Sequence, residues 1–340
     1  MSQPISRASG GSMNRRDALA GLLGLAVALP SRSVFAQGAK GRSARVGVLC
    51  IAQVTEKRLR SVPSELAKLG WAEGSNLVID WRNANGELEA LPRLAGELLA
   101  FGPDVILADG NVTTQSLMQQ GRAIPVLVFA SLDPVGVGLA RSVARPGGNV
   151  TGLMWSEPTL AAKIVSLLHE SVPRARRLAV IYDPGVPGIQ AYVEADRTAA
   201  VALGMEMRDY HVRSAKDLTN VLESLSMSGT DAIKAALSGH FSGGELPIVL
   251  DYALGKKIPV VSVSSIAAQL GALLAYSPSN SERIARISGQ LDNILRGAKP
   301  AEMPFEFPTR LELAINLRTA KALGITVPSS VLMRADHLIE

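Results

Sequence analysis

Cysteine is nearly absent from the sequence: Cys50 is the single copy among 340 residues. One thiol cannot form a disulfide within the chain, so the fold depends on its apolar core even in an oxidising compartment. Cys50 lies near the end of an apolar run at residues 46–51, which is typical of a strand. We expect a buried, inert thiol there rather than a nucleophile.

Aromatic residues are also scarce, at 4% of the chain, and charged residues make up 19%. Hydrophobic residues nevertheless reach 47%, which excludes a disordered chain and predicts cores built from Leu, Val and Ala. A chain of this length exceeds the usual size of a single hydrophobic core, so we expect about two domains.

Sequence signals of catalysis or metal binding are missing. The histidines are scattered, without the i, i+4 pairing or cysteine partners of a metal site. They are His169, His211, His240 and His337. The sequence contains neither a G-x-S-x-G elbow nor a P-loop. We therefore expect no catalytic residues, no metal and no cofactor, and we interpret the protein as a binding protein rather than an enzyme.

Long apolar runs are absent from the sequence after the N-terminal segment. No stretch there reaches the roughly 18 residues that a membrane span requires. The N-terminal run at residues 18–29 is itself too short to span a bilayer. It follows Arg15 and Arg16, and it precedes Val34 and Ala36 at positions −3 and −1 of a potential cut. This order predicts a signal peptide that is cleaved after Ala36. The alternative is a buried N-terminal helix.

The paired arginines resemble a twin-arginine export signal, but the residues after them fit that motif poorly and the ordinary secretory route stays open. By either route we expect a periplasmic protein. Removal of residues 1–36 takes away four of the 35 basic and one of the 30 acidic residues, so the formal charge falls from +5 to +2. A charge so close to zero gives no support to nucleic-acid binding.

The rest of the sequence alternates between strand-like and helix-like segments with a period of about 25 residues, the pattern of parallel sheets with right-handed crossovers. In the first half, strands are expected at 45–51, 77–81, 104–108 and 124–130, with helices at 55–69, 88–101 and 113–121. In the second half, strands are expected at 177–182, 205–212, 231–237, 258–263 and 272–275. The fold class is therefore α/β, with two similar halves.

Between the halves lies a loop at residues 145–152, which contains Gly147, Gly148 and Gly152. A short helix is expected just before it, at residues 137–144. Because these glycines free several backbone dihedral angles, the loop could carry the chain from one sheet to the other and act as a hinge. The alternative is an ordinary surface loop.

The C-terminal residues fit neither half simply. They contain a long amphipathic helix at 282–296, a short extended segment at 303–307 and a helix at 311–323. If the chain crosses back to the first half and then returns, several strands connect two lobes around a cleft. We accordingly expect a first lobe and a second lobe that are each built from two segments. These segments are 44–150 with 278–302, and 151–277 with 303–340.

Six segments, taken in order, resemble one protein family. They read LGWAEGSNLVI at 69–79, DPVGVGL at 133–139, RPGGNVTG at 145–152, ILRGAKP at 294–300, INLRTAKALGITVP at 315–328 and LMRADHLIE at 332–340. The set is similar to ABC-transporter substrate-binding proteins whose characterised members include binders of tryptophan and other aromatic amino acids. The resemblance covers nearly all of the chain after about residue 44.

The resemblance implies a type I periplasmic-binding-protein-like fold, with two Rossmann-like lobes of parallel strands joined by a multi-strand hinge. It also implies an exported receptor, expected to be a monomer, that passes a small solute to an ABC permease in the inner membrane. Two other functions stay open: a sensing partner of a membrane signalling protein, and a periplasmic α/β enzyme. The chain departs from the family pattern at residues 52–57 and 237–244, which should lie at the cleft.

Ligands of open parallel sheets bind at the carboxyl ends of the strands, so polar residues at those ends are the candidates for the site. In the first lobe they are Gln53, Asn111, Thr113, Thr114, Ser131 and Asp133. In the second lobe they are Asp183, Ser238, Tyr276 and Ser277. We expect the ligand to be an amino acid or a small carboxylate.

Each of these candidates also has a structural alternative. Thr113 and Thr114 at a helix start suit a ligand carboxylate, or one of them caps its helix. Asp183 suits a ligand ammonium, while Asp133 could do so or could cap the segment after Pro134. Trp155, just past the predicted hinge, could stack on a planar ligand or pack in the core.

Overall fold

The computed structural model describes residues 43–121, 123–236 and 245–340. The predicted signal peptide and the whole departing segment at 237–244, which includes Ser238, lie outside these ranges, and their predictions are not tested. All described residues belong to one compact unit, which contains two sheets. None of the described helices is long and apolar enough to cross a membrane.

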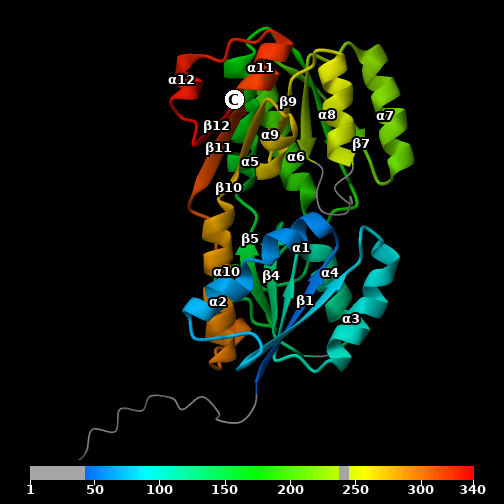
Figure 1. The fold of residues 1–340 in the computed structure, drawn as a ribbon. Coiled ribbons are helices and arrows are strands. Elements are labelled where there is room, and N and C mark those ends of the chain that lie inside the picture. Colours follow the sequence, from blue (N-terminus) through cyan, green and yellow to red (C-terminus); the bar gives the residue numbers. More distant parts are fainter. Residues whose placement is uncertain (1–42, 122, 237–244) are drawn as a thin grey trace, which may run out of the picture. The chain divides into compact units, whose positions relative to one another are not determined.

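The first sheet has five parallel strands in the order β2-β1-β3-β4-β5 (Figure 1). They are β1 Ala44–Cys50, β2 Leu77–Asn83, β3 Val105–Ala108, β4 Val126–Ser131 and β5 Val150–Met154. The associated helices are α1 Gln53–Leu59, α2 Val62–Lys68, η2 Leu88–Ala90, α3 Leu91–Ala100, α4 Asn111–Met118, α10 Asn280–Leu295 and η3 Pro300–Glu302. Helices α2 and α10 pack on one face of the sheet, and α3 and α4 on the other. All residues of β3 are buried, as expected for a strand that is covered on both faces.

The second sheet has seven strands in the order β12-β11-β10-β9-β8-β6-β7. They are β6 Arg177–Tyr182, β7 Glu206–His211, β8 Ala232–Ala236, β9 Val260–Ser262, β10 Leu274–Pro278, β11 Leu311–Asn316 and β12 His337–Ile339. The helices are α5 Pro158–Ser171, α6 Ile189–Ala202, α7 Ala215–Ser228, α8 Glu245–Gly255, α9 Ser265–Leu270, α11 Leu317–Leu323 and α12 Ser329–Leu332. Helices α5 and α6 bury one face, and α7, α8 and α9 the other. The α/β fold class with two sheet-centred lobes is confirmed.

Three segments connect the sheets: residues 155–157 after β5, Ser279 between β10 and α10, and residues 308–310 before β11. Strand β5 pairs along β4, and Glu306 exchanges backbone hydrogen bonds with Gly152 and Met154 of β5. Residues 151–154 and the extended segment around Glu306 therefore lie with the first sheet. We propose lobe boundaries at these three connections, rather than after residues 150, 277 and 302.

The hinge glycines of the sequence lie just ahead of the first connection. Gly152 is inside β5 with φ +146°, and a Cβ on it would come within 2.2 Å of the Val128 carbonyl oxygen of β4. This glycine permits close strand pairing, which is a packing reason for its presence. A hinge role for Gly147, Gly148 and Gly152 stays a prediction.

Two expected helices are wrong. Residues 311–316 form β11, which pairs antiparallel with β10. Only the rest of the expected helix is helical, as α11. Asn316 caps its first turn by accepting a hydrogen bond from the Thr319 amide. Leu, Glu and Ala favour helices, but pairing with β10 overrides that weak propensity. Residues 137–144 form turns, in which the amides of Leu139 and Ala140 share the Pro134 carbonyl.

Candidate functional site

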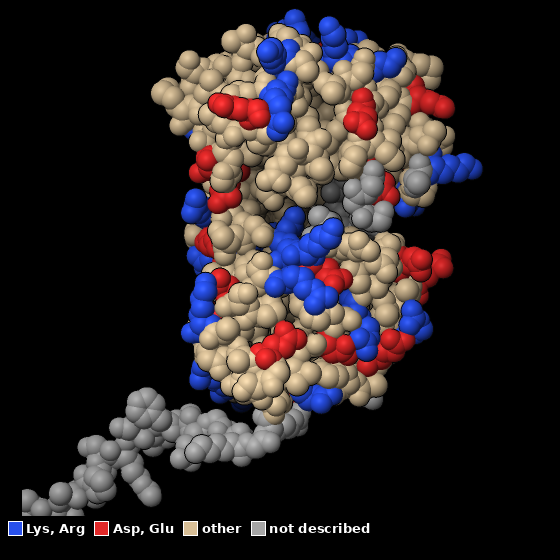
Figure 2. Space-filling model, in the orientation of Figure 1, with Lys and Arg blue, Asp and Glu red and all other residues tan. Residues whose placement is uncertain are grey.

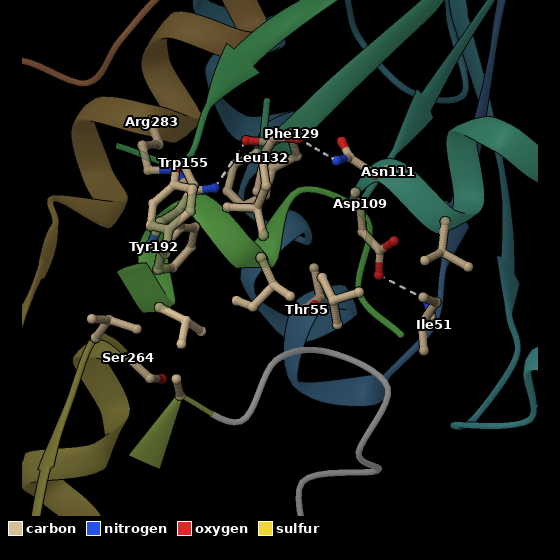
Figure 3. Close-up of a pocket in the computed structure, with 18 of the residues that line it drawn as sticks. Ile51, Thr55, Asp109, Asn111, Phe129, Leu132, Trp155, Tyr192, Ser264 and Arg283 are labelled. Carbon is tan, nitrogen blue, oxygen red and sulfur yellow. Dashed lines mark hydrogen bonds between the residues drawn. The ribbon is translucent and has the colours of Figure 1, made fainter. Parts of the chain in front are cut away.

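A cavity of about 210 Å³ lies where strand ends of both sheets meet (Figure 3). From the first sheet it is lined by residues that follow β1, β3 and β4. From the second sheet it is lined by α6 and by the ends of β8 and β9. Most of the lining is apolar. The apolar side chains are Ile51, Val112, Phe129, Ala130, Leu132, Trp155, Val186, Ile189, Tyr192, Val193, Ala236 and Val263.

An aromatic wall forms one side of this cavity. Trp155 comes from the first connection between the sheets and Tyr192 from α6, and both side chains line the cavity (Figure 3). The Tyr192 hydroxyl donates to the Ser156 carbonyl at 2.5 Å, which fixes the ring. Burial raises the pKa of Tyr192 to about 12, so the phenol stays neutral. The wall therefore presents rigid aromatic faces to a ligand.

Arg283 of α10 is fully buried, lines the cavity and stacks on the Trp155 ring of the aromatic wall. Its guanidinium carbon lies 4.0 Å from the Phe129 ring centroid and 4.7 Å from that of Trp155. One terminal nitrogen donates to the Phe129 carbonyl at 2.9 Å. Its Nε has no hydrogen-bond partner among the described residues. The cation is thus held by π faces and a single carbonyl rather than by a carboxylate.

Arg58 of α1 contributes a second guanidinium to the lining. It is half-buried, and its guanidinium makes no ion pair or hydrogen bond with any described residue. Burial lowers the pKa of Arg58, and burial together with the charge of Arg58 lowers the pKa of Arg283 well below its usual value. Figure 2 shows basic side chains gathered on the surface where α1 lies.

Asp109 follows β3 and supplies a carboxylate on the side of the cavity away from Arg283 (Figure 3). It accepts hydrogen bonds from the Ile51 amide at 2.7 Å and from the Thr113 hydroxyl at 3.0 Å. Burial nevertheless raises its pKa to about 6, because these bonds only partly compensate for desolvation.

A buried ion pair completes the polar lining. Lys234 of β8 and Asp196 of α6 lie 2.5 Å apart, and each side chain is 2% exposed. Burial lowers the pKa of Lys234 and raises that of Asp196, while their mutual attraction opposes both changes. The two groups are already matched in charge, unlike the arginines.

Among the described residues, Asn111 is the one of the polar candidates that lines the cavity, and Trp155, the aromatic candidate, lines it too. The amide nitrogen of Asn111 donates to the carbonyls of Leu132 and Pro187, and its oxygen accepts from the Ser131 hydroxyl. The contact with Pro187 joins the two lobes. Asn111 and Ser131 thus hold the cavity wall together.

The other polar candidates that the structure describes lie outside the cavity lining. The Thr113 hydroxyl accepts from the Gly110 amide at the start of α4, and the Asp133 carboxylate accepts from the Gly136 amide, as their structural alternatives anticipated. The Thr114 hydroxyl donates to the Gly110 carbonyl. Asp183 accepts from the Gly185 amide, and Gln53 contacts Asn85. Tyr276 and Ser277 lie in β10. Direct contact of these residues with ligand stays a prediction.

The sequence reasoning missed Arg58, Arg283, Tyr192 and the Lys234–Asp196 pair. The sequence did carry a signal for the burial of Arg283. It is a charged residue on the apolar face of an amphipathic helix, one turn after the buried Ser279 and one turn before the buried Ile287. Asp109 stands at a strand end that the sequence already placed at the cleft, and it lines the cavity. Arg58 carried no signal that distinguishes it from Lys57 or Arg60.

The two lobes, their three connections and the cavity between strand ends define a solute-binding protein. The chain belongs to the family described as "ABC transporter substrate binding protein", whose model matches residues 54–339. It is therefore a receptor that captures a solute for ABC transport, which confirms the resemblance seen in the sequence.

Several known proteins are similar to this chain. The tyrosine-binding protein of Clostridioides difficile (strain R20291) is 25% identical over 271 residues, which are 79% of this chain and 77% of that protein. A conserved domain protein from Vibrio cholerae is 25% identical, with a TM-score of 0.81 over 87% of this chain and 100% of that one. The ABC domain from Streptococcus pneumonia in complex with L-Trp is 24% identical, with the same TM-score and coverage.

Proposed function

We propose that this protein binds an aromatic amino acid in the cavity and delivers it to an ABC permease in the inner membrane. The observation that carries the proposal is the aromatic wall of Trp155 and Tyr192, backed by Phe129. Aromatic side chains pack well against a planar ligand. An apolar cavity of about 150 Å³ already holds a benzene ring, and this cavity has about 210 Å³.

Charges of both signs favour a zwitterion over a neutral solute. Arg58 and Arg283 supply positive charge to the lining, and Asp109 supplies a carboxylate on another side. An α-amino acid carries one charge of each sign at neutral pH, so it can complement both groups. The names of the similar proteins, a tyrosine-binding protein and an L-Trp complex, support the same ligand class.

Substrate-binding proteins of this family work outside the cytoplasmic membrane. We propose export through the signal peptide at residues 1–36 into the periplasm, where the protein acts as a monomer. N-terminal sequencing of protein recovered from the periplasm should begin at Gln37. Retention of residues 1–36 in that material would contradict the assigned signal.

Isothermal calorimetry with L-tryptophan, L-tyrosine, L-phenylalanine, L-leucine and L-alanine tests the ligand class. The aromatic amino acids should bind more tightly than leucine and alanine. Trp155→Leu should lower the affinity for aromatic ligands by about tenfold, since stacking contributes roughly 0.5–1.5 kcal/mol to binding beyond area burial.

Trp81→Leu is the matched control, because Trp81 packs under Arg60 on the first sheet and does not line the cavity. It should leave the affinity unchanged. Equal affinity for alanine and tryptophan, or equal effects of the two Trp variants, would count against an aromatic ligand.

A further inference from the structure

Arg58 and Arg283 line the cavity and have no acidic partner among the described residues, whereas the third basic residue of the lining and the next arginine of α10 do. Lys234 lies against Asp196, and Arg286, one turn beyond Arg283 on α10, lies 2.8 Å from Glu282 and 2.9 Å from Glu306. Arg58 and Arg283 have no ion pair with any described residue. Arg286 is thus paired with carboxylates, whereas Arg58 and Arg283 line the cavity without such a partner.

Such an arrangement is costly for the protein alone. A buried guanidinium loses its hydration, and only a paired anion or a full set of hydrogen bonds compensates for that loss. The two cations also repel each other, as the effect of Arg58 on the pKa of Arg283 shows. An anion between them would relieve both costs at once.

We propose that Arg58 and Arg283 form a carboxylate subsite, which binds the carboxylate of the ligand while its apolar body lies against Trp155 and Tyr192. Planar guanidinium groups match a carboxylate with two parallel hydrogen bonds, which fixes the orientation of the ligand as well as its charge. The identity of the ligand body rests on the proposed function; the carboxylate does not.

The rest of the lining favours an organic carboxylate over a small inorganic anion. Apolar side chains form most of the cavity, and a sulfate or phosphate ion would leave them without a partner. The position of Arg283, stacked on the Trp155 ring, places the positive charge beside the aromatic wall. A short link between ring and carboxylate, as in an aromatic amino acid, fits this placement.

Calorimetry with matched ligands tests the subsite. The probes are L-tryptophan, indole-3-propionate, which keeps the carboxylate and lacks the ammonium, and tryptamine, which keeps the ammonium and lacks the carboxylate. L-leucine, succinate and sulfate extend the set to other anions. Wild-type protein should bind the two indole carboxylates at least about tenfold more tightly than tryptamine. Tryptamine lacks the carboxylate and therefore loses a buried hydrogen bond between charged groups.

Arg58→Gln is the main variant, because Arg58 is only half-buried and packs against no aromatic ring. It should weaken the carboxylate ligands by about 10- to 100-fold and leave tryptamine unchanged. Lys57→Gln removes the same charge from the same helix at an exposed position outside the cavity, and should change no affinity more than about twofold.

Thermal melting of the ligand-free protein gives a second readout. Arg58→Gln should keep or raise the melting temperature, because it removes an uncompensated charge, whereas a structural arginine would lower it on removal. Arg283→Lys keeps the charge beside the aromatic wall but loses the planar fork, and should also weaken carboxylates. If Arg283→Lys fails to fold, the carboxylate affinity of Arg58→Gln by itself tests the subsite.

The outcomes separate the subsite from the proposed ligand. Unchanged carboxylate affinity in Arg58→Gln, or tryptamine bound as tightly as tryptophan, overturns the subsite and leaves an aromatic ligand standing. Binding of leucine, succinate or indole-3-propionate through Arg58 without binding of tryptophan supports the subsite and overturns the aromatic amino acid. Selective binding of sulfate, or no binding of any carboxylate, overturns the subsite.

Discussion

At the scale of single residues, Asp109 combines a buried carboxyl group with a position in the cavity wall. No basic side chain of the described chain pairs with it, and burial raises its pKa to about 6. Because this value is above the usual 3.8 of an aspartate, the ionised form costs stability in the folded protein. That cost is absent below about pH 4, grows as the pH rises to about 6 and is constant above it.

A ligand ammonium should therefore bind more tightly as Asp109 ionises. Calorimetry should show the affinity for tryptophan rising between about pH 5 and pH 7, while that for indole-3-propionate does not rise. Asp109→Asn should abolish the rise, weaken tryptophan about tenfold at pH 7.5 and raise the melting temperature of the ligand-free protein at that pH. The same pH dependence in Asp109→Asn would place the ammonium elsewhere.

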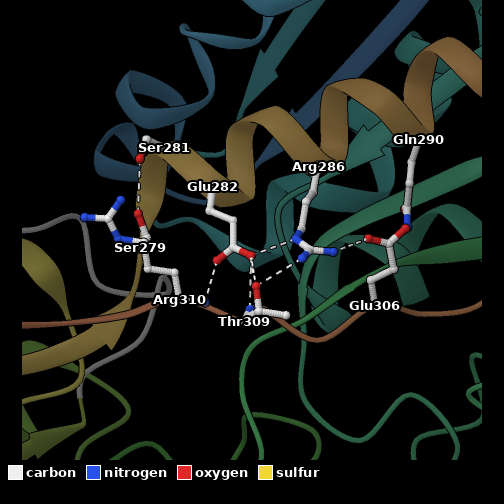
Figure 4. A network of polar contacts seen from close by, with 8 residues as sticks. All are labelled: Ser279, Ser281, Glu282, Arg286, Gln290, Glu306, Thr309 and Arg310. Carbon is white, nitrogen blue, oxygen red and sulfur yellow. Dashed lines mark hydrogen bonds and ion pairs between the residues drawn. The ribbon is translucent and has the colours of Figure 1, made fainter.

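At the scale of secondary-structure elements, α10 holds the third connection between the sheets through a polar network (Figure 4). Glu282 accepts from the amides of Thr309 and Arg310 and from the Arg286 guanidinium. Arg286 and Gln290 both reach Glu306, which also pairs with β5. The helix thus fixes the connecting segment from Glu306 to Arg310.

Burial favours the neutral form of Glu282, but the hydrogen bonds from Thr309, Arg310 and Arg286 outweigh it and lower the pKa to about 2. Its stabilising contribution is therefore full above about pH 4.5 and is lost as the pH falls toward 2. In chemical denaturation at pH 7, Glu282→Gln should lower the free energy of unfolding by about 1–3 kcal/mol, the range for hydrogen bonds to charged groups.

Glu302→Gln is the control for this network, since Glu302 is exposed in η3 and makes none of these contacts. It should change the free energy of unfolding by less than about 0.5 kcal/mol. The difference between the two variants should shrink at pH 3. Equal stability of both variants at pH 7 would mean that the network contributes nothing to the fold.

At the scale of the whole molecule, the lobes touch beside the cavity. Asn111 donates to the Pro187 carbonyl across the lobes at 2.9 Å. Gly188, with φ +88°, approaches the Leu132 carbonyl so closely that a Cβ on it would lie 2.5 Å from the oxygen. If the protein closes around its ligand as a hinged receptor does, we predict that this contact belongs to the closed form.

Gly188→Ala should oppose closure and so lower the affinity for the ligand. In small-angle X-ray scattering, tryptophan should decrease the radius of gyration of the wild-type protein, and the variant should not show this decrease. Gly204→Ala, at the other end of α6, is the control. It introduces the same left-handed strain at φ +68° but meets no atom within 4 Å. Both should destabilise the fold, by about 1 kcal/mol, but only Gly188→Ala should impair closure. Equal compaction in both variants would argue against closure at this contact.

The sequence by itself determined the α/β class, the two-lobed organisation and most helix and strand positions. Apolar periodicity and glycine stops are local signals, and buried parallel strands such as β3 carry them strongly. The structural alternatives for Thr113 and Asp133 were also readable, because their capping hydrogen bonds run to residues three positions away. The family segments added the transport role.

Only the tertiary structure decided which side chains face the cavity. Arg283 reaches Phe129 across 154 residues of sequence, and Lys234 reaches Asp196 across 38. Residues 311–316 became a strand for the same reason, since β10 supplied the pairing that local propensity did not predict. Such contacts depend on the packing of helices and sheets that are distant in the chain, so no local pattern encodes them. Which charged side chains face one another across the cavity was therefore decided by the assembly of the lobes.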